Sequence, residues 1–369
     1  MKFDFVAPCY FGTESAAAFD FKRIGAENVA VTDGRVSFSG GADILAAANL
    51  YSRCAERILI RLASYPAKTF DELFDGVYAI PWEEYLPADA AFPVKGSSLS
   101  STLSSVPACQ SIVKKAVVER LKKGWRTGTL PETGGEYRIR FSLRKDMAEI
   151  FLDTSGDGLH KRGYRRNSTL APLKETLAAA MLDLGRVYPD STVQDPFCGS
   201  GTMCIEAAMK AMRIAPGLRR RFAAEHYAFV PKEAFTQARE KALSEIVRDA
   251  PFEAFGSDID PAAVELATHN AKLAGVGSKC RFSVADVRKF TPSGRSLVFT
   301  NPPYGERLGS LEEAAELARV LGKRLEESPV RGAYIITADA EFESHFGRRA
   351  KRRRKLYNGM IPCQVYMYF

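Results

Sequence analysis

The sequence lacks several features that would assign it to a specialised class of protein. No apolar run approaches the ~18 residues that a membrane-spanning helix needs, so we expect no membrane partner. The seven cysteines lie far apart without a Cys-x-x-Cys pair, which argues against a zinc ribbon, an iron–sulfur cluster or a disulfide scaffold. The first residues, MKFDF, include an acid and begin no long apolar core, so we expect no secretory signal. These absences predict free thiols, no bound metal and a cytoplasmic location.

The composition is that of a globular chain with an excess of basic residues. Hydrophobic residues make up 46% and charged residues 26% of the 369 residues, which excludes wholesale disorder and predicts two or three domains. The net charge of +8 favours polyanions such as nucleic acid. The basic residues also cluster, most densely as RRAKRRRK at 348–355, which we call the basic run. Several separate clusters predict a binding surface rather than a disordered tail.

Apolar periodicity in the first half of the chain predicts an α+β region. Short strands are expected at 3–6 and 29–31. A helix from residue 42 should run into a strand at 57–61, and a second helix should cover 106–123. Two alternating runs, 137–143 and 147–152, predict a hairpin.

Strand and helix signals alternate in the second half, which predicts a doubly wound, mostly parallel sheet. Pro172 suits the first turn of a helix that precedes the first strand. The expected strands are 192–194, 253–257, 281–285, 297–300 and 333–337, with helices at 202–212, 261–274 and 311–326. The last residues should form an antiparallel edge hairpin around Gly359, and the long segment 213–250 should add helices to one face. We place the domain boundary between an α+β domain at 1–155 and an α/β domain at 156–369.

A glycine-rich turn, DPFCGSGT at 195–202, ends the first of these strands and begins a helix. Glycines there let a ligand approach the backbone, and a helix N-terminus offers free N–H groups. The third glycine of a dinucleotide motif and the Gly-Lys-Ser/Thr of a Walker motif are both absent. At the ends of the next two strands, Asp258 suits a ribose diol, Ile259 an adenine face and Asp286 an adenine amine.

The most specific motif is Asn301-Pro302-Pro303-Tyr304 at the end of the fourth strand. Two prolines stiffen the backbone and remove two N–H donors. The Asn301 side-chain oxygen and the Pro302 carbonyl can then both accept from one exocyclic amine, which frees the nitrogen lone pair without a strong base. Tyr304 can stack on a base taken out of its helix. Cys198 is not expected to act as a nucleophile, because amine chemistry of this kind needs none.

The segments DPFCGSGT, GSDIDP (256–261) and NPPYGERL (301–308) resemble the class I S-adenosylmethionine-dependent amino-methyltransferases. Two further segments, LHKRGYR (159–165) and APLKET (171–176), resemble the THUMP-domain RNA methyltransferases, in particular the RlmL/YpsC-like group. That group makes N2-methylguanosine in large-subunit ribosomal RNA. The resemblance runs over the whole chain and is strongest from residue 159 onward.

This resemblance implies a Rossmann-like methyltransferase domain preceded by a ferredoxin-like and THUMP region, with S-adenosyl-L-methionine as cofactor and 23S ribosomal RNA as substrate. The implied catalytic residues are Asn301, Pro302, Pro303 and Tyr304. The implied cofactor residues are Asp195, Pro196, Phe197, Cys198, Gly199, Ser200, Gly201, Thr202, Asp258, Ile259, Asp286, Val287 and Asn301. The basic clusters then provide the expected RNA contacts, Lys161, Arg162, Arg165, Arg348, Arg349, Lys351 and Arg352. Some relatives carry a second methyltransferase domain, and we expect none after Phe369.

Other interpretations stay open at this point. A tRNA guanine-N2 methyltransferase is the nearest alternative, because THUMP domains commonly serve tRNA modification. An adenine-N6 or protein-glutamine methyltransferase would use the same Asn-Pro-Pro-Tyr motif, although the basic first half argues against a protein substrate. A catalytically silent RNA-binding or assembly factor is a further alternative, against which the intact motif argues.

Overall fold

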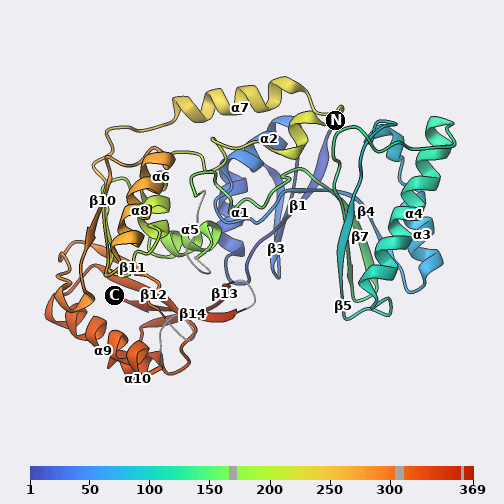
Figure 1. Cartoon of the computed structure of the whole chain (residues 1–369). Coiled ribbons are helices and arrows are strands. Elements are labelled where there is room, and N and C mark those ends of the chain that lie inside the picture. Colours follow the sequence, from blue (N-terminus) through green and yellow to red (C-terminus); the bar gives the residue numbers. More distant parts are fainter. Residues whose placement is uncertain (166–172, 304–310, 359–360) are drawn as a thin grey trace.

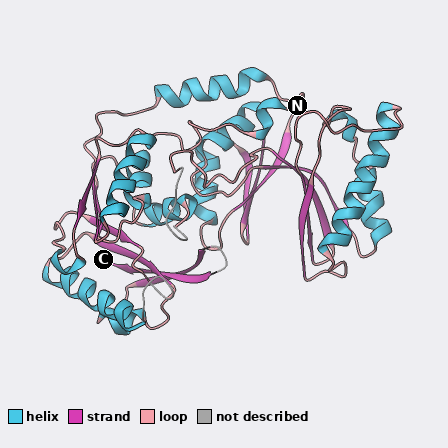
Figure 2. Cartoon of the chain, in the orientation of Figure 1, coloured by secondary structure: helices cyan, strands magenta, loops and turns pink. Residues whose placement is uncertain are grey.

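The computed structural model describes residues 1–165, 173–303, 311–358 and 361–369. Within these residues the chain forms two seven-stranded sheets, one in each half (Figures 1 and 2). Pro172, Tyr304 and Gly359, on which three of our expectations fall, lie outside the described residues. None of the described helices is long and apolar enough to cross a bilayer.

The first sheet has the strand order β2-β3-β1-β4-β7-β6-β5 and is antiparallel except for the β5–β6 pair. Its strands are β1 (Phe3–Pro8), β2 (Glu27–Thr32), β3 (Arg35–Gly40), β4 (Leu59–Pro66), β5 (Val94–Leu99), β6 (Ile139–Arg144) and β7 (Met147–Asp153). Its helices are α1 (Glu14–Arg23), α2 (Ala42–Tyr51), α3 (Phe70–Tyr78) and α4 (Val106–Trp125), with a 3-10 turn at Trp82–Glu84. The sequence IRFSLR explains β6, since alternate residues Ile139, Phe141 and Leu143 are buried.

The expected α+β character of this half is confirmed, with three omissions. The sequence patterns did not predict α1, β3 or β5. The sequence VKGSSL of β5 has a glycine and two serines, so its strand propensity is low. Pairing with β6 along its whole length holds it in the sheet.

The second sheet has the order β10-β9-β8-β11-β12-β14-β13, parallel except for the last two strands. Its strands are β8 (Thr192–Asp195), β9 (Glu253–Asp258), β10 (Cys280–Val284), β11 (Leu297–Thr300), β12 (Gly332–Thr337), β13 (Arg352–Asn358) and β14 (Ile361–Tyr368). Its helices are α5 (Glu175–Leu184), α6 (Thr202–Ala211), α8 (Pro261–Ala274), α9 (Leu311–Glu327) and α10 (Phe342–Phe346). The expected doubly wound sheet with an antiparallel terminal hairpin is confirmed.

Both faces of this second sheet are covered. In β11, Leu297 and Phe299 pack into one core with α5, α6 and α8, whereas Val298 packs into another with α9 and α10. The order of the strands reverses at β8, which lies between β9 and β11. Ligands of such sheets bind where this reversal opens a crevice at the carboxyl ends of the strands.

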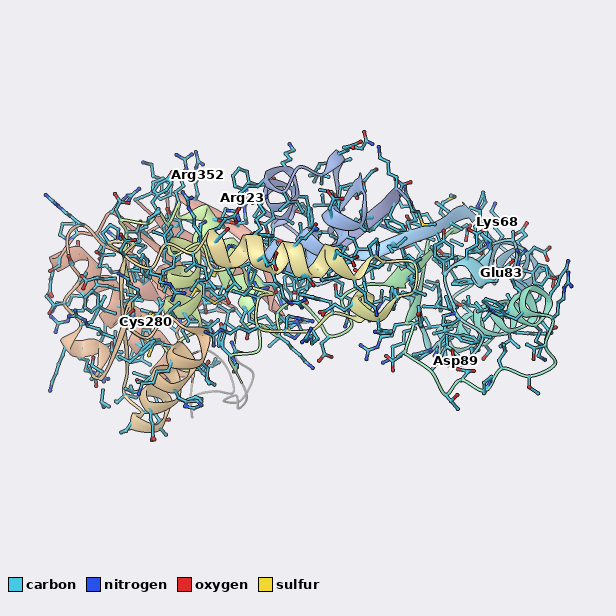
Figure 3. All side chains as sticks on the ribbon, turned by 90° about the horizontal axis from the view of Figure 1, so that it is seen from above. Arg23, Lys68, Glu83, Asp89, Cys280 and Arg352 are labelled. Carbon is cyan, nitrogen blue, oxygen red and sulfur yellow. The ribbon has the colours of Figure 1, made fainter. Side chains whose placement is uncertain are left out.

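The segment 213–250 joins the two halves. It contains α7 (Lys232–Ser244) and a 3-10 turn at Ala223–His226. The expected additional helix is present, but its expected place on a face of the second half is wrong, because its buried residues Phe235 and Ala242 belong to the core of the first half. Figure 3, viewed from above, shows α7 lying along the middle of an elongated molecule. The segment thus adds to the packing of the first half although it lies within the second.

Candidate active site

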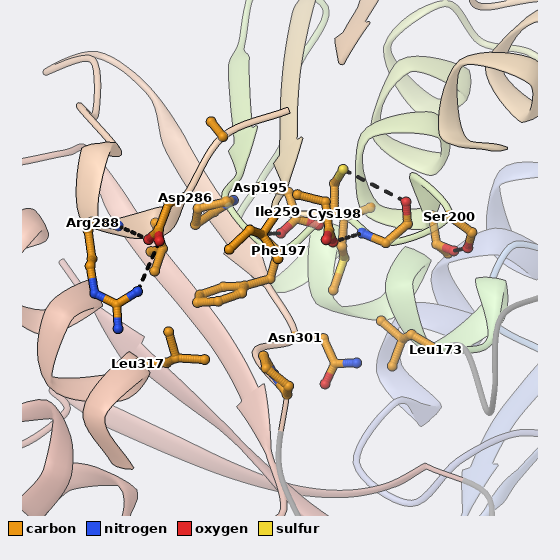
Figure 4. Close-up of a pocket in the computed structure, with 18 of the residues that line it drawn as sticks. Leu173, Asp195, Phe197, Cys198, Ser200, Ile259, Asp286, Arg288, Asn301 and Leu317 are labelled. Atoms are coloured by element: carbon orange, nitrogen blue, oxygen red, sulfur yellow. Dashed lines mark hydrogen bonds and ion pairs between the residues drawn. The ribbon is translucent and has the colours of Figure 1, made fainter. Parts of the chain in front are cut away.

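A cavity of about 530 Å³ lies at the carboxyl ends of β8, β9 and β11, which is a usual size for a small-molecule site. Most of the residues expected to bind the cofactor line it: Asp195, Pro196, Phe197, Cys198, Gly199, Ser200, Thr202, Asp258, Ile259, Asp286, Val287 and Asn301. Figure 4 shows Asp286 and Leu317 on one side, Ser200 and Leu173 on the other, and Phe197 and Asn301 between them. The fold therefore brings three separate motifs to one place.

The two glycines of the glycine-rich turn have different physical roles. Gly199 has φ +49°, and a Cβ atom added there would meet nothing within 4 Å, so open space lies beside its backbone. Gly201 has φ +83°, and an added Cβ would lie 3.0 Å from both Ala267 and Phe282. Gly201 lies outside the cavity lining and allows α6 to pack closely against α8 and β10. Only Gly199 is therefore placed to let a ligand approach the backbone.

Asp258 holds the glycine-rich turn against the end of β9. Its Oδ2 accepts from the Gly199 N–H at 2.9 Å, and its Oδ1 accepts from the Asp260 N–H at 3.1 Å. A carboxylate has lone pairs left after two such bonds and can still accept from hydroxyl groups in the cavity. The neighbouring Ile259 is 68% exposed at the cavity wall, although large apolar side chains are usually buried.

Asp286 lies at the end of β10 and is held by Arg288. The Arg288 backbone N–H and its guanidinium both donate to this carboxylate, at 2.7 and 2.9 Å. The backbone hydrogen bond is the largest of the causes that lower the pKa of Asp286 below its ordinary value. Asp286 is therefore an ionised acceptor at neutral pH, and Val287 beside it is buried.

Asp195 is buried at the end of β8. Its Oδ1 accepts from the Thr300 hydroxyl at 2.6 Å and from the Phe197 N–H at 3.1 Å. Burial raises the pKa of Asp195 to about 7, because these two bonds only partly offset the desolvation of its charge. Burial also raises the pKa of the Cys198 thiol, so that side chain stays neutral at physiological pH.

Asn301 lines this cavity and carries an unpaired polar atom. Its Oδ1 is buried and, within the described residues, has no hydrogen-bond donor. A buried acceptor without a partner costs free energy, and such atoms occur where a ligand supplies the donor. Pro303 lines the same cavity and Pro302 is buried. The oxygen is thus held ready for an N–H group from outside the chain.

The structure also shows cavity residues that the sequence patterns did not indicate. They are Leu173, Met203, Ala285, Arg288, Glu313, Glu316 and Leu317. The last three share one face of α9 at i, i+3 and i+4 spacing. The sequence could have indicated these three α9 residues. The helix that follows the Asn-Pro-Pro-Tyr segment must begin at the same edge of the sheet, so its first turns lie near the cavity.

The RNA contact expected at Arg162 is wrong, because the side chain is buried. Arg162 is 3% exposed, lies 3.4 Å from Glu206, and donates to the Arg53 carbonyl at 2.5 Å. The signal for this pair was Glu206 itself, an acid in the apolar stretch MCIEAAM that needs a buried partner. Lys161 is exposed and forms an ion pair with Asp157 at 3.4 Å.

Arg165 is also placed differently from our expectation. Its guanidinium donates to the Thr202 hydroxyl at 2.7 Å and pairs with Glu175 at 3.2 Å, and only 10% of its side chain is exposed. The contact with Thr202 holds Arg165 against the first turn of α6. An RNA contact at Arg165 is therefore wrong as well, because its charge is used inside the fold.

The basic run lies away from the cavity. Arg348, Arg349 and Lys351 are exposed and line a hollow with residues 329–330, which precede β12. Arg352 of β13 lies opposite Met367 of β14 in the antiparallel strand pair, near the same end of the sheet. These four cations therefore lie toward the amino ends of the parallel strands, whereas the cavity lies at the carboxyl ends. Their contact with RNA stays a prediction.

A doubly wound sheet with a glycine-rich turn after its first strand, acids after the next two and Asn-Pro-Pro after the fourth defines a class I methyltransferase. Comparison with known families agrees. Residues 162–367 match the RMKL-like methyltransferase domain, residues 4–59 the RlmL ferredoxin-like domain and residues 67–153 the THUMP domain. The chain belongs to this family of THUMP-containing, S-adenosylmethionine-dependent methyltransferases.

Individual relatives cover the whole chain. A putative RNA methyltransferase YpsC of Bacillus subtilis is 43% identical over 100% of this chain and 96% of its own. The ribosomal RNA large subunit methyltransferase K/L of Syntrophotalea carbinolica is 35% identical over 98% of this chain, which spans about half (53%) of that relative.

Two solved structures are also similar over the whole chain. One is described as a predicted N6-adenine-specific DNA methylase from Listeria monocytogenes (42% identity, TM-score 0.94, 100% of this chain and 96% of that one). The other is the putative methyltransferase SMU.472, crystallised with SAH (39% identity, TM-score 0.93, 100% and 98%).

Proposed function

We propose that this protein methylates the exocyclic N2 amine of a guanosine in 23S ribosomal RNA. The observation that carries the chemistry is the buried, unpartnered Oδ1 of Asn301, a residue that lines the same cavity as the glycine-rich turn and the two acids. An amine with two N–H donors supplies what this oxygen lacks. S-adenosylmethionine, when bound, supplies the methyl group that such an amine accepts.

The cavity residues fit that cofactor. The open space beside the Gly199 backbone leaves room for it. Asp258 would accept from the ribose hydroxyls, and the exposed Ile259 would pack on the adenine. Asp286 and Val287 would contact the edge of the cofactor's adenine ring, and Asp195 would lie near the amino-acid end of the cofactor.

The residues of this chain act on the amine. Asn301 Oδ1 accepts one amine N–H and, in our proposal, the Pro302 carbonyl accepts the other. Acceptors fixed before the reaction stabilise the positive charge that develops on nitrogen, at no cost in reorganisation. Cys198 takes no part, because its buried thiol is neutral. Tyr304 would stack on the flipped base.

Ribosomal RNA rests on the names of the relatives, and guanine rests only on the resemblance of the motifs to the N2-methylguanosine group, rather than on the cavity. The K/L relatives are named for the large ribosomal subunit, and one similar structure is described as an adenine methylase. The THUMP domain supports an RNA substrate over DNA. A tRNA guanine is the second candidate, because THUMP domains commonly serve tRNA.

Two variants should separate base activation from cofactor binding. Asn301→Ala should lower the methyl-transfer rate about 10²–10³-fold, as when one preorganised transition-state partner is lost. Its affinity for S-adenosylmethionine, measured by calorimetry, should change little. Asp258→Ala is the matched control and should lose about 1–3 kcal/mol of cofactor affinity.

The product identifies the base and the RNA. Transcribed 23S ribosomal RNA and tRNA, methylated in vitro and analysed by nucleoside mass spectrometry, should yield N2-methylguanosine from the ribosomal RNA. N6-methyladenosine as the main product would overturn the base assignment. Methylation of tRNA alone would overturn the assignment to ribosomal RNA, and an unchanged rate for Asn301→Ala would overturn the mechanism.

A further inference from the structure

The family matches leave a linker at residues 154–161, between the THUMP region and the methyltransferase region. The backbone of this linker is bonded to the first half of the chain on one side. The N–H groups of Thr154 and Leu159 donate to the carbonyl oxygens of Ile58 and Glu56, at 3.1 and 2.8 Å. Both acceptors belong to the ferredoxin-like region at 4–59. The N–H side of the linker is therefore held by the ferredoxin-like region.

The carbonyl side of the linker is bound by one arginine of the second half, Arg220. Its Nη1 donates to the carbonyl oxygens of Gly158 and Lys161, at 2.7 and 3.0 Å. Its Nη2 donates to those of Ser155 and Asp157, at 3.3 and 2.7 Å. The four N–H groups of the two terminal nitrogens can thus each meet a different carbonyl. Within the described residues Arg220 forms no ion pair, so its charge strengthens these four bonds instead.

The ferredoxin-like and THUMP regions each send an arginine to the same linker. Arg57 of the ferredoxin-like region donates to the Gly156 carbonyl, and Arg138 of the THUMP region donates to the same oxygen at 2.7 Å. All three regions of the chain therefore meet at this linker. Arg57 and Arg138 share a single carbonyl, whereas Arg220 binds four. Removing Arg220 would consequently release most of the linker carbonyls.

The segment that carries Arg220 is itself fixed to the first half. The Ala224 N–H donates to the Thr154 carbonyl at 3.0 Å, and the Tyr227 hydroxyl donates to the Asp153 carbonyl at 2.5 Å. Phe222, two residues after Arg220, is buried in the core of the first half. Figure 1 shows α7 of the same segment beside α2 of the first half. Arg220 is therefore held on a base that belongs to the packing of both halves.

We propose that Arg220 is a positioning residue for methyl transfer. By binding the carbonyls of the linker, it holds the THUMP region in one place relative to the cavity that contains Asn301. The inference rests on the proposed function, since a fixed placement affects the reaction only if one RNA molecule occupies both parts of the chain.

The physical reason is that Arg220 acts where the two parts of the chain are joined. Without the guanidinium, four linker carbonyls would bond to water, and the backbone dihedral angles of 155–161 would no longer be fixed by one rigid group. A small rotation at this linker displaces the THUMP region relative to the cavity. A displacement of about 1 Å far from the chemistry can lower a rate about 10²-fold, because the reacting groups lose their alignment.

Distances between two spin labels, measured by pulsed electron–electron double resonance, test this placement without RNA. The labels are attached at Gln110→Cys on α4 and Glu265→Cys on α8, both exposed positions, whereas the seven native cysteines are buried. The labelled protein should give one narrow distance distribution, and adding Arg220→Gln should broaden it. Arg221→Gln is the matched control: its side chain is 87% exposed and pairs with Glu225. This neighbouring change removes the same charge and should leave the distribution narrow.

Single-turnover methylation of transcribed 23S ribosomal RNA, at saturating RNA, tests the consequence for the reaction. The rate should fall about 10–100-fold in Arg220→Gln and should be unchanged in Arg221→Gln. Affinity for S-adenosylmethionine, measured by calorimetry, should be the same in both variants, because neither residue lines the cavity. Arg220→Lys keeps the charge but lacks the planar donors, so its rate should lie between wild type and Arg220→Gln. The lysine variant carries the test if Arg220→Gln does not fold.

The outcomes separate positioning from a general effect on stability. An unchanged distance distribution in Arg220→Gln would overturn the proposal, as would equal broadening in Arg221→Gln. A loss of cofactor affinity and melting temperature in parallel with the rate would mean that Arg220 only stabilises the fold. No methyl transfer by the wild type to any RNA would overturn the proposed function. Transfer by Arg220→Gln at the wild-type rate would instead overturn the role of Arg220 alone.

Discussion

The two sheets of this protein expose different parts of themselves to a ligand. The first sheet is mostly antiparallel, and the helices that follow its strands pack on one face, so no helix covers the opposite face. The second sheet is mostly parallel, and its crossovers place helices on both faces. A ligand can therefore reach the first sheet across a face and the second only at the ends of its strands. The type of connection between successive strands thus decides where each half of the chain can bind a ligand.

The strand-end site of the second sheet contains one buried acid, Asp195. Removing its charge should have the largest effect on the free energy of unfolding. Asp195→Asn keeps Oδ1, which accepts both existing hydrogen bonds, and removes the charge. Folding raises the pKa of Asp195 from its ordinary value near 3.8 to about 7, so the folded protein holds this proton more tightly than the unfolded chain does. The stability that the protonated carboxyl contributes is therefore fully present below pH 3.8 and is lost as the pH rises toward 7. The free energy of unfolding of the wild type should therefore fall, relative to Asp195→Asn, by roughly 3–4 kcal/mol between pH 4 and pH 8.

Urea denaturation of both proteins without cofactor, at pH steps from 4 to 8, measures this difference. A constant gap between the two curves would mean that Asp195 is ionised in the fold throughout and would contradict the raised pKa.

The two glycines of the glycine-rich turn should sharpen the distinction between packing and binding. Gly201→Ala should cost about 2–3 kcal/mol of stability, since it combines a strained φ with contacts at 3.0 Å. Gly199→Ala should cost about 1 kcal/mol, because only its φ is strained. Calorimetry should show the reverse order for the cofactor, with Gly199→Ala weakening binding about tenfold. Equal cofactor affinities in both variants would place the ligand away from Gly199.

The basic run should show the smallest effect. Replacing Arg348, Arg349 and Lys351 by Gln removes three cations at the amino edge of the second sheet. If RNA reaches the carboxyl edge without crossing the amino edge, the salt slope of binding should change by no more than about 0.7, the value for one phosphate. A change near 2, measured by fluorescence anisotropy with a 20-nucleotide oligouridine, would mean that RNA also contacts the amino edge, as the sequence predicts.

The sequence predicted the second half better than the first. Strong alternation of apolar strands and capped helices located every parallel strand, and Asp260, Pro261 and Gly275 marked the ends of α8 as the structure has them. In the first half, β5 has low strand propensity and pairs with a strand about 45 residues later. Local patterns contain no record of such pairing, because it depends on where α4 returns the chain.

The sequence by itself determined the order of the motifs and hence the family, since a glycine-rich turn, two acids and Asn-Pro-Pro at successive strand ends are together typical of a nucleoside site. Only the tertiary structure decided which basic residues are available. Arg162 and Lys161 are neighbours in the sequence, yet one is buried against Glu206 and the other is exposed. The helix-free face of the first sheet likewise exists because seven strands from two regions share one sheet with helices on a single side. Burial is a property of packing between distant segments, and no local pattern of charge specifies it.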